Sequence, residues 1–482
     1  MLKAAAFPTI ALLLLSGEAG QLHAQGMVSQ GGAGDNADRA RCSSIEPEVA
    51  IPGCTRIIGD KSEAADIRGA ALRNRGFAYQ QKDELDRAIA DYTAALKLNP
   101  KDHGVEAKTY VNLGLVYVQK GDDAQGLTDY SQAVLLDPKL ASAYVNRAAI
   151  FIEHGDNGHA IADLDKVAEL KPKDSATYVS RGALHAQSGD QDQAIADYTK
   201  AIELNPTNPI AWRNRGFAYR TKGDVAKAEA DAAEAIRLDP GMVSAHQDLG
   251  MSLQETGDAA RAISEFGKAI QLDPGNAQAI KARGDSYLAQ GDRDRAIADF
   301  SQAIGLDPKM ISAYNNRGVA YLGNGERDLA IADFTVVIAM DPTQAAAHLN
   351  RGEALEAQHD RAGAIADFDQ VIRISPNTIE AYRQRAALRV ESSDFDGAVA
   401  DYDQVVARAP TDSEALRGRG FAQLRRRDNQ AAISDLTAAI ANNPKDALAY
   451  RFRSLAYVAA HDLKHAIVDD DAAFRLNPAV DR

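Results

Sequence analysis

The sequence has little of several features that mark broad classes of protein. It contains two cysteines in 482 residues, which excludes a disulfide-rich scaffold. Beyond its first residues it has no long apolar run, which excludes a multi-span membrane protein. Positive charge is not in excess, because 54 Lys and Arg stand against 68 Asp and Glu. A net charge of −14 repels polyphosphate, so we expect no nucleic acid partner.

Catalytic motifs are missing as well. The sequence has no G-x-S-x-G, no H-E-x-x-H, no P-loop and no dinucleotide-binding fingerprint. His461 and His465 have i, i+4 spacing, but they fall near a predicted turn, and we interpret them as surface residues. The run from Asp469 to Asp471 could suggest a cation site, but we interpret it as the polar face of a solvated final helix. We therefore expect no enzyme activity, no cofactor and no metal site.

The first residues have the layout of an export signal. Lys3 precedes an apolar stretch from Ala4 to Leu15, and small and polar residues follow. A stretch of about 12 residues is too short to span a bilayer comfortably, although a retained anchor is the alternative. We expect a signal peptide over residues 1–24 and a glycine-rich, flexible tether over residues 25–40. The mature protein would then be periplasmic or secreted, without stable membrane insertion.

What the sequence has in abundance is an internal repeat. Prolines recur through the chain, first 38 residues apart and then at ten successive intervals of 34 residues. They are Pro100, Pro138, Pro172, Pro206, Pro240, Pro274, Pro308, Pro342, Pro376, Pro410, Pro444 and Pro478. A period of this length is typical of stacked arrays of small helical or mixed units.

Each unit contains two amphipathic segments, numbered so that the proline is at position 32. Large residues recur at positions 4 and 11 and small ones at position 8, as in Trp212, Tyr219 and Gly216. Positions 20 and 27 are small and position 24 is usually aromatic. Each set lies on one face of a helix, so close packing of two antiparallel helices is expected. Gly-Asp at positions 15 and 16 predicts the end of the first helix and the cap of the second.

This pattern resembles the tetratricopeptide repeat. The resemblance rests on segments such as Ala211 to Tyr219 followed by Ala228 and Pro240, and twelve units in phase cover most of the chain. It implies an all-α fold: a right-handed superhelical solenoid of about twelve helix-turn-helix units over residues 69–482. It also implies protein or peptide partners bound in a concave groove. The oligomeric state is left open.

Residues 41–68 precede the first complete unit. Ala50 to Ile58 has the pattern of the second helix of a partial repeat. Cys42 and Cys54 lie in this segment, and export would place them where disulfides persist. We expect one structural disulfide, since their spacing does not fit a C-x-x-C redox pair.

Two further positions carry opposite charges in register. Position 7 is arginine in ten of the twelve units and position 23 is acidic in all twelve. The arginines are Arg75, Arg147, Arg181, Arg215, Arg283, Arg317, Arg351, Arg385, Arg419 and Arg453. The pairs Arg215 with Asp231 and Arg317 with Asp333 exemplify the predicted arginine–carboxylate ladder between packed helices. The alternative is a row of anion-binding arginines.

The resemblance also places candidate partner-binding residues at positions 2, 5, 9 and 12 of the first helices. These positions are apolar toward the N-terminus, at Val111, Leu115, Val118, Val145 and Ile152. They are basic toward the C-terminus, at Arg383, Arg417 and Arg451. Asparagine recurs at position 6, including Asn112 and Asn146, where it would either bind the backbone of an extended peptide or simply solvate the helix.

The favoured hypothesis is therefore an exported, non-enzymatic scaffold that binds a protein or peptide segment with apolar and acidic parts. The alternative is a structural or assembly factor in cell-envelope biogenesis or in glycan-related complexes. The sequence names no partner.

Overall fold

The computed structural model describes residues 33–98 and 102–479, and this part of the chain contains helices and no strands. The predicted signal peptide lies outside the described residues. The chain divides into two units, residues 1–256 and residues 257–482. No described helix is long and apolar enough to cross a membrane.

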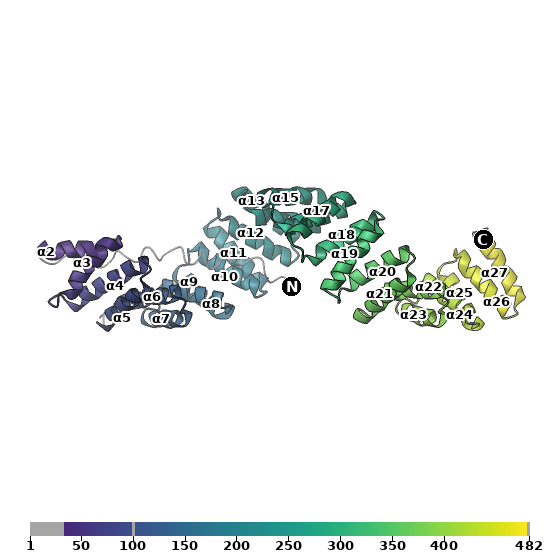
Figure 1. Ribbon diagram of the computed structural model, residues 1–482, viewed down its shortest axis with the longest axis horizontal. Coiled ribbons are helices and arrows are strands. Elements are labelled where there is room, and N and C mark those ends of the chain that lie inside the picture. The colour runs from purple at the N-terminus through teal and green to yellow at the C-terminus, as the bar shows by residue number, and fades with distance from the viewer. Residues whose placement is uncertain (1–32, 99–101, 480–482) are drawn as a thin grey trace. The chain divides into compact units, whose positions relative to one another are not determined.

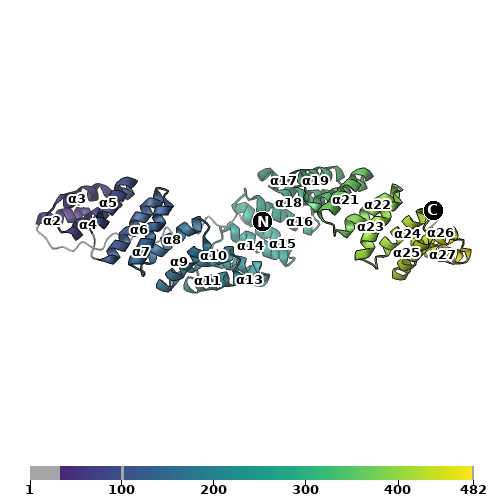
Figure 2. The ribbon, with the colours of Figure 1, turned by 90° about the horizontal axis from the view of Figure 1, so that it is seen from below.

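The first unit begins with a hairpin of α2 (Ala33–Cys42) and α3 (Pro47–Gly59). Its further helices are α4 (Ala65–Gln81), α5 (Leu85–Lys97), α6 (His103–Gln119), α7 (Asp123–Leu136), α8 (Ala141–Glu153), α9 (Asn157–Leu170), α10 (Ser175–Gln187), α11 (Gln191–Leu204), α12 (Pro209–Thr221), α13 (Val225–Leu238) and α14 (Val243–Glu255). Each of these helices packs on its sequence neighbours, as Figures 1 and 2 show.

The second unit continues the same pattern. Its helices are α15 (Ala259–Leu272), α16 (Ala277–Ala289), α17 (Arg293–Leu306), α18 (Ile311–Gly323), α19 (Arg327–Met340), α20 (Ala345–Ala357), α21 (Arg361–Ile374), α22 (Ile379–Glu391), α23 (Phe395–Arg408), α24 (Ser413–Arg425), α25 (Asn429–Asn442), α26 (Ala447–Ala459) and α27 (Leu463–Leu476). Successive hairpins lie side by side (Figure 1). The predicted all-α array of helical hairpins is therefore confirmed.

One prediction about the N-terminal segment is wrong. The sequence predicts a flexible tether that includes residues 33–40, but these residues form most of α2. Arg39 lies almost fully buried on this helix and donates two hydrogen bonds to Glu63, at 3.0 and 3.1 Å. Asp38 accepts two more from Arg56. These long-range ion pairs connect α2 to α3 and to the segment before α4, so the partial repeat has both of its helices.

The turn within each hairpin follows the predicted chemistry. Gly223 adopts a φ of 83°, and the side chain of Asp224 accepts a hydrogen bond from the Lys227 backbone N–H at the start of α13. Where the glycine is replaced, the backbone conformation is unchanged: Ser393 has a φ of 62° and Arg427 a φ of 68°. The tertiary packing imposes this left-handed conformation on residues that rarely adopt it.

In most hairpins the core joins a small residue of the first helix to a ring of the second. Phe334 on α19 is fully buried against Gly318 on α18, where an added Cβ would lie 2.7 Å from the ring. Phe300 meets Gly284 in the same way in the preceding hairpin, at 2.8 Å. Glycine at these two positions is thus required by close approach, because a methyl group there would overlap the ring.

Candidate functional site

The N-terminal hairpin is closed by a disulfide bond between Cys42 and Cys54, with an S–S distance of 1.97 Å. Both cysteines are buried beside Ile57 and Ala71. The carbonyl of Cys42 accepts a hydrogen bond from the side-chain amide of Asn74 at 3.1 Å, which ties the hairpin to α4. The bond thus joins α2 to α3 at the end of the array.

The arginines at position 7 and the aspartates at position 23 form ion pairs between the two helices of a hairpin. Arg215 Nε lies 2.8 Å from Asp231 Oδ2 and Arg215 Nη2 lies 2.9 Å from Asp231 Oδ1. Arg317 and Asp333 repeat this geometry at 2.8 and 2.7 Å. The same two-pronged pair occurs at Arg75–Asp91, Arg147–Asp163, Arg181–Asp197, Arg283–Asp299, Arg351–Asp367, Arg385–Asp401, Arg419–Asp435 and Arg453–Asp469. The aspartates are buried, and the hydrogen bond to Asp231 raises the pKa of Arg215.

The remaining guanidinium nitrogen reaches back to the preceding hairpin. Arg215 Nη1 donates to the hydroxyl of Thr199 on α11 at 3.1 Å. Position 25 of the preceding repeat provides an oxygen in the same way for Arg147 (Ser131), Arg181 (Asp165), Arg317 (Ser301), Arg351 (Thr335), Arg385 (Asp369), Arg419 (Asp403) and Arg453 (Thr437). Arg75 makes the same contact with Thr55 on α3, 20 residues before it. One arginine therefore joins three helices, and a lysine with a single nitrogen lacks this fork.

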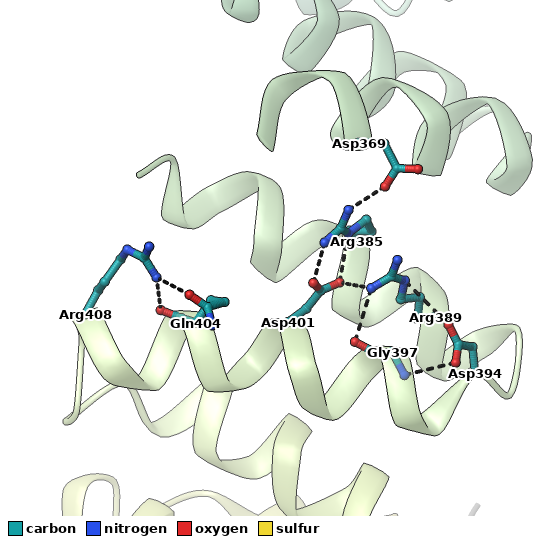
Figure 3. A network of polar contacts seen from close by, with 8 residues as sticks. All are labelled: Asp369, Arg385, Arg389, Asp394, Gly397, Asp401, Gln404 and Arg408. Atoms are coloured by element: carbon teal, nitrogen blue, oxygen red, sulfur yellow. Dashed lines mark hydrogen bonds and ion pairs between the residues drawn. The ribbon is translucent and has the colours of Figure 1, made fainter. Parts of the chain in front are cut away.

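Figure 3 shows the ion pairs of the ladder in repeat ten, where additional side chains join them. Arg385 lies between Asp401 and Asp369, and Arg389 donates a second bond to Asp401 at 2.7 Å. Arg389 stands at position 11, where most repeats have a ring or an apolar residue. These contacts occupy the donors of the arginines and leave them largely buried. The geometry therefore favours a structural role for this ladder over the alternative of anion binding.

The ladder is interrupted in repeat two. Leu113 occupies position 7 there, and the buried Asp129 receives one hydrogen bond, from Gln125 at 3.3 Å. Its Oδ2 atom is buried without a hydrogen-bond partner. Burial raises the pKa of Asp129 to about 6, and the bond from Gln125 offsets part of this rise.

The face expected to bind a partner requires one correction. Val111 is fully buried, because it packs with Tyr130 of its own repeat and with Ala143 and Ile150 of the next. It cannot contact a partner while these helices stay packed. The other apolar candidates, Leu115, Val118, Val145 and Ile152, are half-buried, as are Asn112 and Asn146.

The arginines at position 5 near the C-terminus are paired with acids. Arg383 donates to Asp412 at 2.6 Å and Arg417 donates to Asp446 at 2.7 Å. Both aspartates cap the first helix of the following repeat. Arg451 binds Asp470 on α27. The charges of these arginines are largely offset, so the segment is less basic than its sequence indicates.

Three exposed apolar residues lie at groove positions that sequence reasoning missed. Leu448, Leu455 and Val458 occupy positions 2, 9 and 12 of α26 and are 42%, 38% and 47% exposed. Their positions in the repeat, 2, 9 and 12, were the feature of the sequence that could have identified them.

The same face of the first helix is acidic in repeat nine. It carries Glu353 and Glu356 on α20, and burial together with neighbouring glutamates raises the pKa of both.

Stacked helical hairpins with a common capped turn and an alternating small–aromatic core define an all-α repeat protein. Five family models, each described as a tetratricopeptide repeat, match segments of it. The segments are residues 69–102, 107–140, 141–174, 184–223, 209–242, 243–276, 284–325, 315–378, 383–447 and 422–479. Together they cover most of the chain, which is thus a protein of tetratricopeptide repeats.

Solved structures with similar folds include proteins of different lengths. A tetratricopeptide repeat protein from Parabacteroides merdae is 21% identical, covers 52% of this chain and 98% of its own, and gives a TM-score of 0.39. MamA is 29% identical over 34% of this chain and 96% of its own, with a TM-score of 0.33. Yeast Tom70 is 19% identical over 87% and 99%, with a TM-score of 0.35. No curated protein matches the chain.

Proposed function

We propose that this protein is a non-enzymatic scaffold that binds a protein or peptide along positions 2, 5, 9 and 12 of its first helices. The observation that carries the proposal is the exposed apolar row of Leu448, Leu455 and Val458 on α26. Covering such partly exposed side chains contributes about 1 kcal/mol each. A preformed helical surface also loses little conformational entropy on binding.

The charges beside this row suggest the chemistry of the partner. Arg383 and Arg417 are paired but remain 35% and 26% exposed, so a partner carboxylate can approach them from the open side. We infer that the partner has an apolar segment next to acidic residues. Because the arginines already have partners, added charge pairs contribute little, and salt should weaken binding only modestly.

In the first unit the same positions offer Leu115, Val118, Val145 and Ile152, which are half-buried. We propose that they form a second, weaker contact region for an apolar part of the partner. Asn112 and Asn146 lie next to it and would donate hydrogen bonds to an extended peptide backbone.

We further propose that the protein is exported and works in the periplasm or outside the cell. The support is the buried Cys42–Cys54 disulfide, because such bonds persist in oxidising compartments. Pulse-chase labelling of the full chain in a secretion-competent host would show a shortened, exported product, and a full-length cytoplasmic product would contradict export.

Selection of peptides from a displayed random library on the full chain tests the binding function. We expect enriched sequences with apolar and acidic residues. Their affinity should fall at least tenfold for Leu455→Asp. Leu135→Asp is the matched control, since Leu135 is 73% exposed on a second helix and away from the proposed face. Failure to enrich any peptide, or equal affinity for both variants, would contradict the proposal.

A further inference from the structure

Repeat nine contains a cavity, open to solvent, where most other repeats have an aromatic ring. It has a volume of about 410 Å³ and lies within the second unit, between α19, α20 and α21. Its walls include Ile338, Pro342, Arg351, Leu355 and Gly363. The volume is within the usual range for sites that hold small organic groups.

Rings normally occupy this place because they stack on the ladder arginine. At position 4, Arg215 lies 4.8 Å from the ring centre of Trp212, and Arg317 lies 5.6 Å from that of Tyr314. At position 11, Arg283 lies 6.0 Å from the ring centre of Tyr287. A guanidinium over an aromatic face is a favourable cation–π contact. In the described part of the chain, Arg351 has no such ring beside it.

The position-4 rings also have a polar contact at their tips. Tyr144 donates its hydroxyl hydrogen to the carbonyl of Pro138 at 3.3 Å, and Trp212 donates to the carbonyl of Pro206 at 2.9 Å. The corresponding residue of repeat nine is His348, and the corresponding carbonyl belongs to Pro342, six residues before it. His348 instead turns its Nδ1 toward Asp367 at 2.8 Å.

Two further truncations enlarge the space. Position 11 is Leu355 instead of a tyrosine. Position 19 is Gly363, where repeat seven has the long side chain of Arg295, which stacks on Tyr287 at 4.5 Å. Repeat eleven also lacks both rings, but there Leu416 is buried at position 4 and fills the space. Repeat nine thus combines a turned histidine, a shorter position 11 and an open position 19.

From this juxtaposition we infer that the cavity is a binding site for one aromatic ring that carries a hydrogen-bond donor, such as a phenol or an indole. The ring stacks on Arg351, contacts Ile338 and Leu355, and donates to the carbonyl of Pro342. The chemistry fits a tyrosine or tryptophan side chain of a partner polypeptide as well as a free small aromatic molecule. Positions 4, 7 and 11 lie on the opposite side of the first helix from positions 2, 5, 9 and 12. The inference therefore goes beyond the proposed groove function and does not depend on it.

Saturation-transfer NMR on the full chain, with 4-methylphenol as the probe, tests the site. We expect saturable binding with a dissociation constant on the order of 1 mM, as befits a one-ring fragment. Toluene lacks the donor and should bind several-fold more weakly. No saturable transfer from the wild-type protein to 4-methylphenol would overturn the inference.

Two variants close the cavity in different ways. His348→Tyr supplies the ring found in repeat three, and Gly363→Arg supplies the cover found in repeat seven. Each should weaken 4-methylphenol binding at least tenfold while the protein stays folded. His246→Tyr is the matched control, because His246 already reaches the Pro240 carbonyl at 3.2 Å, and it should leave binding unchanged. Undiminished binding in both closing variants, with the fold intact, would also overturn the inference.

A competition experiment distinguishes a polypeptide side chain from a free small aromatic molecule as the ligand. N-acetyltyrosinamide carries the phenol on a peptide-like backbone. If it displaces 4-methylphenol, the site accepts a side chain of a polypeptide. If 4-methylphenol binds and the amide does not compete, the site takes a free small aromatic molecule. Both results support a ring-binding cavity and differ in its ligand.

Discussion

Replacing Asp129 by asparagine probes the one aspartate at position 23 of the first unit that has no arginine partner. In repeat two this buried carboxylate faces Leu113 instead of a guanidinium, and its Oδ2 atom has no hydrogen-bond partner. Its charge at neutral pH is therefore a cost to the folded state. Asparagine keeps the shape and removes the charge, so we expect the variant to be more stable than the wild type at pH 7.

The magnitude and the pH window follow from the raised pKa. Burial lifts the pKa of Asp129 from an ordinary 3.8 to about 6. Between these values the folded chain retains a proton that the unfolded chain has lost, so stability falls as pH rises through this window and is constant above it. Two pH units correspond to about 3 kcal/mol. Because the Gln125 bond and nearby water screen the charge, we expect a gain of about 2 kcal/mol at pH 7 and almost none at pH 4.

Hydrogen exchange of the α6 and α7 amides, corrected for intrinsic exchange rates, is a suitable assay, since a repeat array need not unfold in one step. The matched control is Asp163→Asn, which removes the same charge where Arg147 binds it at 2.7 and 2.9 Å. That variant leaves a partly buried guanidinium without its carboxylate and should lose about 2 kcal/mol. If both variants shift stability in the same direction at pH 7, the electrostatic reasoning is wrong.

Three other predictions concern the backbone and the disulfide. Arg427→Gly should raise the free energy of unfolding of its repeat by about 1 kcal/mol in denaturant melts, because φ is 68° at this position. Gly318→Ala should lose about 2 kcal/mol in the same melts, since its Cβ would meet a ring at 2.7 Å, whereas Gly305→Ala, with open space around it, should be neutral or slightly stabilising. Reduction of the Cys42–Cys54 disulfide should lower the protection of the α2 and α3 amides from hydrogen exchange by up to about 3 kcal/mol. Protection of the amides in α16 to α27 should not change, and mass spectrometry measures both.

Features repeated in register were predictable from the sequence. The hairpins follow from the spacing of small and aromatic residues, and the turn at Gly223 follows from Gly-Asp at positions 15 and 16. The ladder follows from arginine and acid recurring 16 residues apart, a separation that a helical hairpin brings face to face. Such periodic features are visible because each of many units repeats the same evidence.

Features that depend on a neighbouring repeat were not predictable in this way. Val111 is buried because it packs with a residue of the next repeat, Ile150, whereas Val145 at position 5 of that next repeat is half-buried. Arg383 loses its free charge to Asp412, which also serves as a helix cap 29 residues later. The helix at residues 33–40 rests on a contact between Arg39 and Glu63. In each case the deciding partner lies outside the hairpin that contains the residue, so the pattern of that hairpin alone does not predict the contact.

The ladder shows how such an array ties its units together. The second helices are rich in alanine, so little apolar surface is buried between neighbouring hairpins. Each guanidinium adds hydrogen bonds that form only when the helices are aligned in one particular way. These ion pairs contribute more to the unique alignment of the helices than to the free energy of unfolding, because the cost of removing the charges from water offsets most of their attraction. Where position 25 lacks an oxygen, the link to the preceding hairpin is lost: Gly267 precedes Arg283, which keeps its bonds to Asp299 alone. Since stability in a repeat array is a sum of units and interfaces, the junction between α15 and α16 loses the contribution of this link. We therefore expect local opening of the second unit to begin near this junction.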